Sequence, residues 1–293
     1  PFHKAFDLPI QGILHTESPH YYREAHEGET EDQFTTRLAN SLNDLIEDEG
    51  PETVAAFIAE PVLGAGGVIV PPDGYYEKIQ AVLERHGVLF IDDEVICGFG
   101  RTGNPFGCQT MGIKPTTMSV AKALSSAYLP ISAVIVPDSM YQPFVEASSE
   151  LGNFAHGFTY TGHPVCAAVA LRNLELMEER QVFAHAAKMG EIFQSRLEQY
   201  DEHPLVGNTR GAGLIGAVEL VADRETGKKF DGSHAVGAFC MNRCLEHGLI
   251  VRSLGDTIAF CPPLIIDDAQ IDELFGKFER ALAETLAYVN ALD

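Results

Sequence analysis

The chain has 293 residues, of which 45% are hydrophobic and 21% charged, a globular composition that excludes a disordered, collagen-like or low-complexity protein. It carries 42 Asp and Glu residues against 20 Lys and Arg, a net charge of −22, which would repel a phosphate backbone and argues against a nucleic-acid partner. No run of about 18 apolar residues is present, so the sequence predicts no membrane span.

The six cysteines are scattered and form no Cys-x-x-Cys pair. Cys240 and Cys244 share one helical face, but no histidine or acidic pattern completes a zinc site beside them. We therefore expect reduced core thiols in a cytoplasmic protein, and no metal. The sequence opens with Pro-Phe-His-Lys and shows neither an initiator Met nor a charged-then-apolar leader.

The first half of the chain alternates helical and strand patterns after a loop-rich entry. Apolar residues at helical spacing predict helices over residues 31–48 and 74–86. Short apolar runs predict strands at residues 54–58, 88–91, 117–121 and 133–136. Continuous apolar strands are typical of a mostly parallel sheet with helices on both faces, so we predict an α/β fold.

The second half begins with a long helical pattern, which runs from about Gly162 toward Tyr200 with few breakers. Beyond it, strands are predicted at residues 214–220, 249–251 and 257–260, and helices at 236–247 and 268–290. This mixture predicts a smaller C-terminal α+β domain. We place residues 1–170 in part of a large domain and residues 171–293 in the small domain with its long connecting helix.

Two segments match the pattern GxGxxG, at residues 98–103 and 211–216. A dinucleotide site needs a strand before the glycines and a helix after them. Asn104-Pro105 follows the first segment and disfavours a helix there, whereas a strand pattern follows the second. We therefore expect these glycines to permit tight backbone turns.

Asp93 follows the apolar strand predicted at residues 88–91. Ligands of open α/β sheets bind outside the carboxyl ends of the strands. A carboxylate at this place can hold a cationic ring nitrogen or a metal, and it can equally cap the following turn.

Lys122 follows another apolar run, and no other lysine lies between Lys114 and Lys188. Apolar surroundings would disfavour its ammonium form and make the amine a nucleophile toward carbonyl groups. An ordinary lysine that extends into solvent is the alternative.

Asp93 and Lys122, in this order and with Gly-Phe-Gly-Arg-Thr-Gly between them, resemble the class III aminotransferases. These are pyridoxal-phosphate (PLP) enzymes with the aspartate-aminotransferase fold, PLP fold type I. The likeness extends over nearly the whole chain, and the family's order is kept by Ala59-Glu60-Pro61, Asp93-Glu94-Val95, Ala121-Lys122, the segment from His156 to Pro164, and Arg210-Gly-Ala-Gly-Leu214. The His-Gly-Phe-Thr-Tyr segment and the late Gly-Leu-Ile-Val-Arg252 are most similar to the ω-amino acid:pyruvate branch.

The resemblance implies cofactor-binding roles for several residues. Lys122 would hold PLP as a Schiff base and move the substrate's proton. Asp93 would pair with the pyridine nitrogen, and Val95 would pack on one face of the ring. Phe158 and Thr159 would come from the neighbouring subunit, where Thr159 reaches the phosphate, so a homodimer or a dimer of dimers is implied.

Two further residues have open roles. Glu60 lies near the cofactor in the family, but it also fits a polar residue that ends a strand before proline. Arg252 resembles the arginine that binds the acceptor's carboxylate as a bidentate fork, and its alternative is a solvated surface arginine.

The resemblance implies an aminotransferase that moves an amino group from an amine or ω-amino acid to a keto acid such as pyruvate. Another PLP enzyme of the same fold (an aminomutase, racemase or decarboxylase) and a cofactor-free inactive fragment remain alternatives. The family's Ser-Gly-Ser-Glu-Ala-Asn phosphate loop and its Tyr-His-Gly aromatic are not found in this sequence, since both precede the place where it begins. Ala127 and Ser132 stand where relatives often carry glycine. We therefore expect these 293 residues alone to bind PLP weakly or not at all.

Overall fold

The computed structural model describes residues 5–292, which fall into two units. The first unit holds the described residues up to Ala56 together with Pro71–Val88, and the second holds Phe57–Val70 and the chain from Leu89 onward. Pro1–Lys4, where the resemblance to the family begins, lie outside the described residues. None of the described helices is long and apolar enough to cross a membrane. The domain boundary expected near residue 170 stays a prediction.

The first unit is built on two helices that the sequence predicted, α3 (Glu31–Glu49) and α4 (Tyr75–His86), preceded by the short α2 (Tyr21–Glu24). Thr30 caps α3 in a capping box, in which its hydroxyl accepts from the Gln33 N–H and the Gln33 side chain accepts from the Thr30 N–H. The apolar stripe of α3 is buried, with Phe34 and Leu38 at 0% exposure. A short 3-10 turn, η1 (Pro51–Thr53), follows α3.

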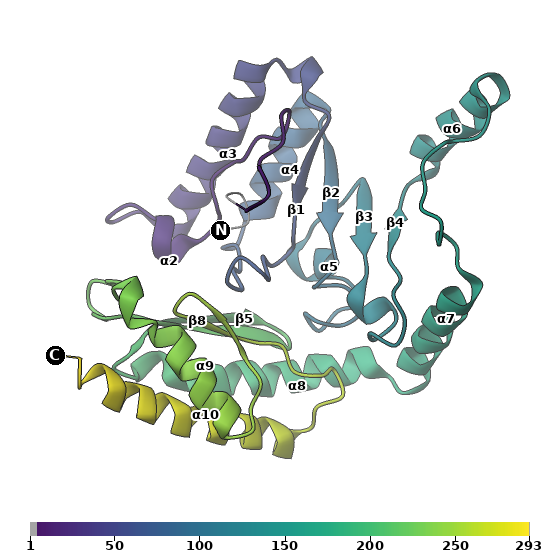
Figure 1. The fold of residues 1–293 in the computed structure, drawn as a ribbon. Coiled ribbons are helices and arrows are strands. Elements are labelled where there is room, and N and C mark those ends of the chain that lie inside the picture. The colour runs from purple at the N-terminus through teal and green to yellow at the C-terminus, as the bar shows by residue number, and fades with distance from the viewer. Residues whose placement is uncertain (1–4, 293) are drawn as a thin grey trace. The chain divides into compact units, whose positions relative to one another are not determined.

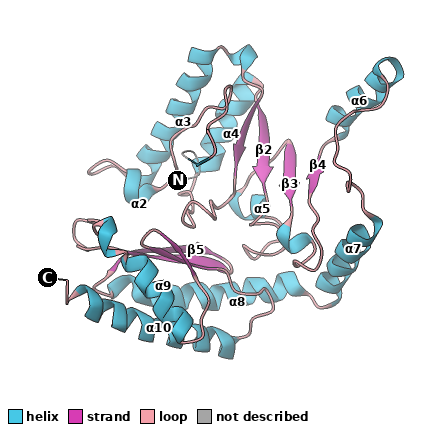
Figure 2. Cartoon of the chain, viewed as in Figure 1, coloured by secondary structure: helices cyan, strands magenta, loops and turns pink. Residues whose placement is uncertain are grey.

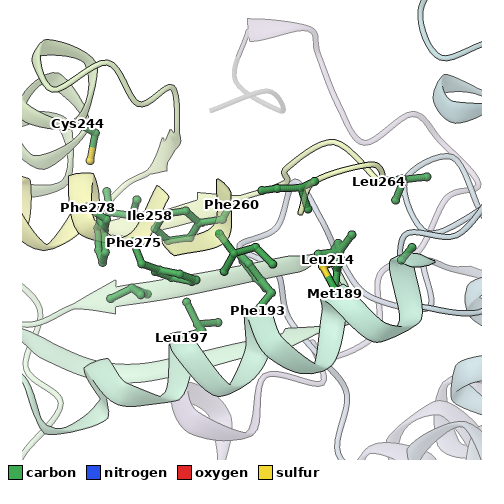
Figure 3. Packing of buried hydrophobic residues seen from close by; sticks show 14 of the residues in the cluster. Met189, Phe193, Leu197, Leu214, Cys244, Ile258, Phe260, Leu264, Phe275 and Phe278 are labelled. Carbon is green, nitrogen blue, oxygen red and sulfur yellow. The ribbon is translucent and has the colours of Figure 1, made fainter. Parts of the chain in front are cut away.

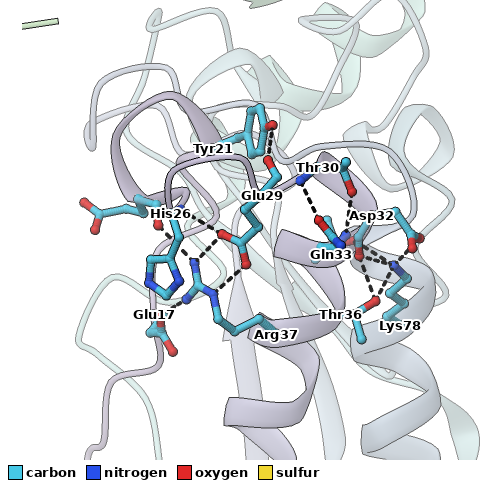
Figure 4. A network of polar contacts seen from close by, with 12 residues as sticks. Glu17, Tyr21, His26, Glu29, Thr30, Asp32, Gln33, Thr36, Arg37 and Lys78 are labelled. Atoms are coloured by element: carbon cyan, nitrogen blue, oxygen red, sulfur yellow. Dashed lines mark hydrogen bonds and ion pairs between the residues drawn. The ribbon is translucent and has the colours of Figure 1, made fainter. Parts of the chain in front are cut away.

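Charged side chains fix the segments of this unit to α3 (Figure 4). The Arg37 guanidinium donates to Glu29 at 2.8 Å and to Glu17 at 2.6 Å. The hydrogen bond from Arg37 and that from the His26 N–H lower the pKa of Glu29 to about 2. On the other side of α3, Lys78 from α4 donates to Asp32 at 2.6 Å.

The second unit begins with a four-stranded sheet of order β1 (Ala56–Ala59), β2 (Leu89–Asp93), β3 (Thr117–Val120) and β4 (Ala133–Ile135) (Figure 1). The register pairs Ile91 with Thr117 across β2 and β3, which run parallel. The pair β3–β4 is antiparallel, with Val120 opposite Ala133. All four strands were predicted from apolar runs. The sheet was expected to be mostly parallel, and the antiparallel pair β3–β4 is the exception.

The sequence predicted helices on both faces of this sheet, but within the described residues some of its apolar side chains remain exposed. Ile58 of β1 is 61% exposed and Val134 of β4 is 67% exposed. Helix α6 (Asp138–Leu151), which the sequence did not predict, follows β4 (Figure 2). It contains no buried residue.

The single long helix expected from Gly162 toward Tyr200 is wrong. The structure has α7 (Pro164–Glu179) and α8 (Val182–Leu197), with the 3-10 turn η3 (Glu198–Glu202) after them. Gln181, between α7 and α8, adopts a left-handed conformation with φ 52°, which ends the first helix without a glycine or proline to signal the break.

A second sheet, entirely antiparallel, has the order β5 (Val206–Ala212), β6 (Ile215–Leu220), β8 (Thr257–Phe260) and β7 (Arg252–Leu254). The helices that accompany it are α9 (Val236–Glu246) and α10 (Asp268–Val289), with η4 (Gly232–His234) before α9. The predicted α+β region is therefore confirmed, but β5 was missed and the strand expected at residues 249–251 lies at 252–254.

Aromatic side chains fill the core between α8, α10 and this sheet (Figure 3). Phe193 of α8 is fully buried and its ring centroid lies 5.2 Å from that of Phe275. Phe260 of β8 meets Phe278 edge-to-face at 4.9 Å. Such pairs contribute about 0.5–1.5 kcal/mol each beyond their burial, so this core fixes the C-terminal helices on the sheet.

Candidate active site

The candidate site lies where neighbouring strands of the first sheet end. Asp93 is the last residue of β2 and is in register with Ser119 of β3. Lys122 opens the 3-10 turn η2 (Lys122–Leu124) two residues after β3 ends. Since β2 and β3 are parallel, both residues lie at the same edge of the sheet, where ligands of α/β folds bind.

Glu60, which follows β1, belongs to the same group of charges. Burial raises the pKa of its carboxyl, and the N–H of Gly64, which donates to it at 3.0 Å, opposes the shift. The negative charge of Asp93 raises the pKa of Glu60 further, whereas the positive charge of Lys122 lowers it. The structure therefore brings Glu60, Asp93 and Lys122 within electrostatic reach of one another.

The Asp93 side chain is half-buried, and its Oδ1 accepts from the Val95 N–H at 3.1 Å. Asp93 thus caps the turn that follows it, which was one of the two roles left open. Within residues 5–292 this is the only hydrogen bond recorded for the carboxylate. An oxygen therefore remains for a cationic donor such as a protonated ring nitrogen.

Lys122 has a strained backbone. Its φ is +41°, in the left-handed region, and the preceding Ala121 has φ −159° and ψ −147°. A residue with a β-carbon pays roughly 1–3 kcal/mol for such a conformation, and strain of this kind gathers at functional sites. The Lys122 side chain is exposed, so the described chain does not supply the apolar surroundings that the sequence predicted for it.

The two GxGxxG segments form turns that pack on each other. Leu214 N–H donates to the Arg101 carbonyl at 2.9 Å, and Arg101 Nη1 donates to the carbonyls of Leu214 and Pro262 at 2.8 and 2.6 Å. Gly213 has φ +57°, and a Cβ there would lie 2.5 Å from the carbonyl carbon of Thr102. The prediction that these glycines permit tight turns is confirmed for Gly100, Gly103 and Gly213, which have positive φ, whereas Gly211 and Gly216 lie within β5 and β6.

Arg210 of β5 holds the loop that follows Glu60. Its Nε and Nη2 donate to the carbonyl of Gly67 at 3.0 and 2.8 Å, while Nη1 donates to Glu219 of β6 at 2.7 Å. The Arg210 and Glu219 side chains are 10% and 8% exposed. This buried ion pair therefore connects the second sheet to the loop beside the site.

Three other predicted residues are exposed and have no recorded side-chain contact with Asp93 or Lys122 in the described chain. Phe158 is 81% exposed, and Thr159 beside it is also exposed. Arg252 is exposed at the start of β7, an edge strand of the second sheet.

Sequence reasoning missed the buried pair that flanks Asp93. Asp92 and Glu94 both have 0% exposure. Glu94 accepts from the N–H groups of Gly107 and Cys108, the first residues of α5 (Gly107–Met111), at 2.9 and 2.7 Å. One signal for this pair was available: Asp92 is an acidic residue that directly follows an apolar run. A carboxyl group buried in such a strand needs a hydrogen-bond or ionic partner, because burying an unpaired carboxylate is costly.

Residues 6–282 match the family model of the class-III aminotransferases. The chain belongs to this family. Among its curated relatives, the chloroplastic gamma aminobutyrate transaminase 3 of Solanum lycopersicum is 48% identical over 97% of this chain and 54% of its own length. The vanillin aminotransferase of Capsicum frutescens is 47% identical over 100% of this chain and 64% of its own length. The chain therefore spans less than two thirds of these class-III relatives.

Solved transaminase structures share the fold. A transaminase with L-Ala superposes with a TM-score of 0.95 and 53% identity, over 97% of this chain and 67% of that one. The omega transaminase of Pseudomonas jessenii in complex with PMP gives a TM-score of 0.96 and 49% identity, over 98% of this chain and 63% of that one. The aspartate-aminotransferase-like fold, PLP fold type I, expected for a class-III enzyme is confirmed.

Proposed function

We propose that the protein containing this chain is a PLP-dependent aminotransferase that moves an amino group from an amine or ω-amino acid to a keto acid such as pyruvate. One observation carries the proposal. Asp93 ends β2 and Lys122 follows the adjacent parallel strand β3, so both lie at one edge of the sheet, where the charge of Glu60 also acts. The family match supports the reaction class, and relatives named as gamma aminobutyrate, vanillin and omega transaminases support the substrate class.

The residues present fit PLP. Asp93 offers a carboxylate oxygen to a protonated pyridine nitrogen, and Lys122 offers a primary amine at the same sheet edge. When bound, PLP supplies an electron-withdrawing ring that weakens the bond between the substrate's carbon and its hydrogen. Lys122 would hold the cofactor through its Nζ, and the same amine would move the substrate's proton once the substrate's amino group had replaced it on the cofactor. The Asp93 carboxylate favours the positively charged ring nitrogen, and Val95, held by its hydrogen bond to Asp93, offers an apolar face to the ring.

The exposed residues have roles that need a second copy of the protein. Phe158 and Thr159 are exposed, which suits residues that complete the phosphate site of a partner subunit in a homodimer. Arg252 is exposed and carries a planar fork of donors, which suits recognition of the carboxylate of the keto acid acceptor.

Lys122 is tested by borohydride reduction of the intact protein loaded with PLP, followed by peptide mapping. We expect the cofactor on Lys122, and no stable attachment in Lys122→Ala. Lys188→Ala, which removes an exposed lysine of α8, is the control and should label normally. Label on another lysine, with Lys122→Ala still labelled, would contradict the proposed site.

Asp93→Asn separates catalysis from binding. The amide is of similar size but cannot favour a protonated ring nitrogen, so we expect PLP to remain bound while kcat falls at least about 100-fold, the scale of losing one preorganised electrostatic contact. Consumption of an amine that depends on added pyruvate distinguishes a transaminase from an aminomutase, racemase or decarboxylase. Turnover without any keto acid would refute the proposed reaction.

A further inference from the structure

A buried cluster of two carboxyls and a thiol lies next to Asp93, on the opposite face of β2. Successive residues of a strand point to opposite faces, so Asp92 projects from the other side of β2. Asp92, Glu94 and Cys108 are all buried, and one ligand-type atom of each lies within 4.8 Å of the others. The proposed reaction uses none of these side chains.

Glu94 is the member of this cluster that accepts hydrogen bonds from backbone N–H groups. Its two oxygens accept from the N–H groups of Gly107 and Cys108, at 2.9 and 2.7 Å. Hydrogen bonds from backbone N–H groups favour the charged form of a carboxyl. Glu94 therefore has two donors in the interior and is joined by them to the start of α5.

Asp92 has the opposite surroundings. Both carboxyl oxygens are buried, and within the described residues neither accepts a hydrogen bond from an N–H or O–H group. The charged and titratable groups that act on it are Glu94, Asp93 and the Cys108 thiol, of which the first two are acidic. A hydrogen bond from the Cys108 thiol lowers the pKa of Asp92, but burial and the neighbouring Glu94 raise it more, so an ionised Asp92 would be costly here.

We propose that Asp92 is a positioning residue that remains a neutral carboxylic acid, donates its hydroxyl hydrogen to Glu94, and so joins the end of β2 to α5 directly behind Asp93. Burial, the charge of Glu94 and the hydrogen bond between the two carboxyls raise the pKa of Asp92 to about 8. Two carboxyls that share one proton are the stable arrangement when like charges are this close. The proposal concerns a proton on the protein itself and stands independently of the proposed aminotransferase activity.

A proton suits this cluster better than a metal ion. The cluster offers only three ligand groups, whereas a structural zinc site takes four. Each Glu94 oxygen already accepts one backbone N–H and can accept one more hydrogen bond, such as that from the Asp92 hydroxyl. Burial and the two neighbouring carboxylates raise the pKa of the Cys108 thiol to about 12, so this thiol stays protonated at neutral pH and is a poor ligand.

Infrared difference spectroscopy of the intact protein tests the proton directly. We expect the carbonyl stretching band of a protonated carboxyl at neutral pH, its disappearance as the pH rises through about 8, and its absence from Asp92→Asn. Glu146→Gln is the control, because Glu146 is an exposed carboxyl of α6 and its loss should leave the band unchanged. Lack of the band at pH 6–7 in the folded wild-type protein would overturn the proposal.

Stability against pH gives a second readout that a purely structural role would not change. An Asp with a raised pKa in the folded state keeps its proton while the unfolded chain loses it above about pH 3.9, so the wild-type protein loses stability as the pH rises from about 4 to about 8. Relative to Asp92→Asn, its unfolding constant should rise up to about tenfold per pH unit in that window. Equal slopes in the two proteins would contradict the proposal.

A third variant and a metal analysis complete the test. Asp92→Asn keeps an N–H donor for Glu94 and Asp92→Ala removes it, so the amide variant should have the higher unfolding midpoint in urea at every pH. A midpoint for Asp92→Ala equal to or above that of Asp92→Asn would refute the hydrogen bond. A metal ion bound one per chain in the wild-type protein and lost from Asp92→Asn would show that a cation, and not a proton, occupies the cluster. If both variants fail to fold, the infrared titration of the wild-type protein decides alone.

Discussion

The buried ion pair between Arg210 and Glu219 gives the sharpest prediction for stability. Arg210→Met removes the cation but keeps most of the side chain's apolar stem. It leaves the Glu219 carboxylate, 8% exposed, without its partner at 2.7 Å, and it removes both donors to the Gly67 carbonyl. The variant therefore tests at once how a buried charge is compensated and how the loop beside Glu60 is held.

The magnitude follows from the burial of the pair. Removal of one partner from a buried ion pair costs about 3–5 kcal/mol, because the remaining charge is left in a poorly hydrated place. We expect Arg210→Met to lower the free energy of unfolding by this amount. The double variant Arg210→Met with Glu219→Leu leaves no charge behind, so it should recover most of the loss, apart from about 1–3 kcal/mol for the abandoned Gly67 carbonyl.

Equilibrium unfolding of the intact protein in urea measures these differences through the transition midpoints. Arg172→Met is the matched control, because Arg172 is 52% exposed and pairs with Glu179 on the surface of α7, where an ion pair contributes at most about 1 kcal/mol. A loss below about 1 kcal/mol for Arg210→Met would refute the reasoning. So would a double variant that is no more stable than the single one.

Three other substitutions test local features through the same unfolding midpoint. Gly213→Ala should cost at least about 2 kcal/mol, since the new Cβ would lie 2.5 Å from the backbone of Thr102 at a left-handed residue, and a smaller loss would show that the two turns separate easily. Gly276→Ala, at an exposed position of α10 with nothing within 4 Å of the new Cβ, should instead stabilise the protein by up to about 1 kcal/mol. Asp267→Ala removes the cap that accepts from the Gln270 N–H at 2.8 Å and should cost about 1 kcal/mol, and an unchanged midpoint would mean that water replaces the cap fully.

Strands of the first sheet could be predicted because their apolar runs are short and end at polar or turn residues. Strand β5 was missed because its residues 206–212 read as polar and glycine-rich, and its charged Arg210 looks like a surface residue. Only the fold shows that Arg210 lies inside, opposite Glu219 on the next strand. The break at Gln181 was missed for a related reason, since no glycine or proline marks its left-handed backbone.

The candidate site could be predicted in part. Asp93 and Lys122 were found because a polar residue directly after an apolar run marks the end of a strand, and parallel strand ends meet at one edge. Glu60 was implied only by the family resemblance, and the fold was needed to show that its charge belongs with those of Asp93 and Lys122. Exposure of Phe158, Thr159 and Arg252 follows from the fold, and whether they complete the site depends on a second subunit, which no single sequence pattern specifies.

The run Asp92-Asp93-Glu94 shows why local placement matters more than charge count. The sequence contains three acids in a row within a chain of net charge −22, which suggests a solvated acidic surface. Alternation along the strand instead separates Asp93 from Asp92 and places Glu94, whose N–H still bonds to Ser119 of β3, on the same face as Asp92. Glu94 accepts hydrogen bonds from two backbone N–H groups, whereas Asp92 accepts none from an N–H group within the described residues. Three consecutive carboxyls therefore have three different surroundings: Asp93 accepts from the Val95 N–H, Glu94 accepts from two backbone N–H groups of α5, and Asp92 accepts from no N–H group in the described chain.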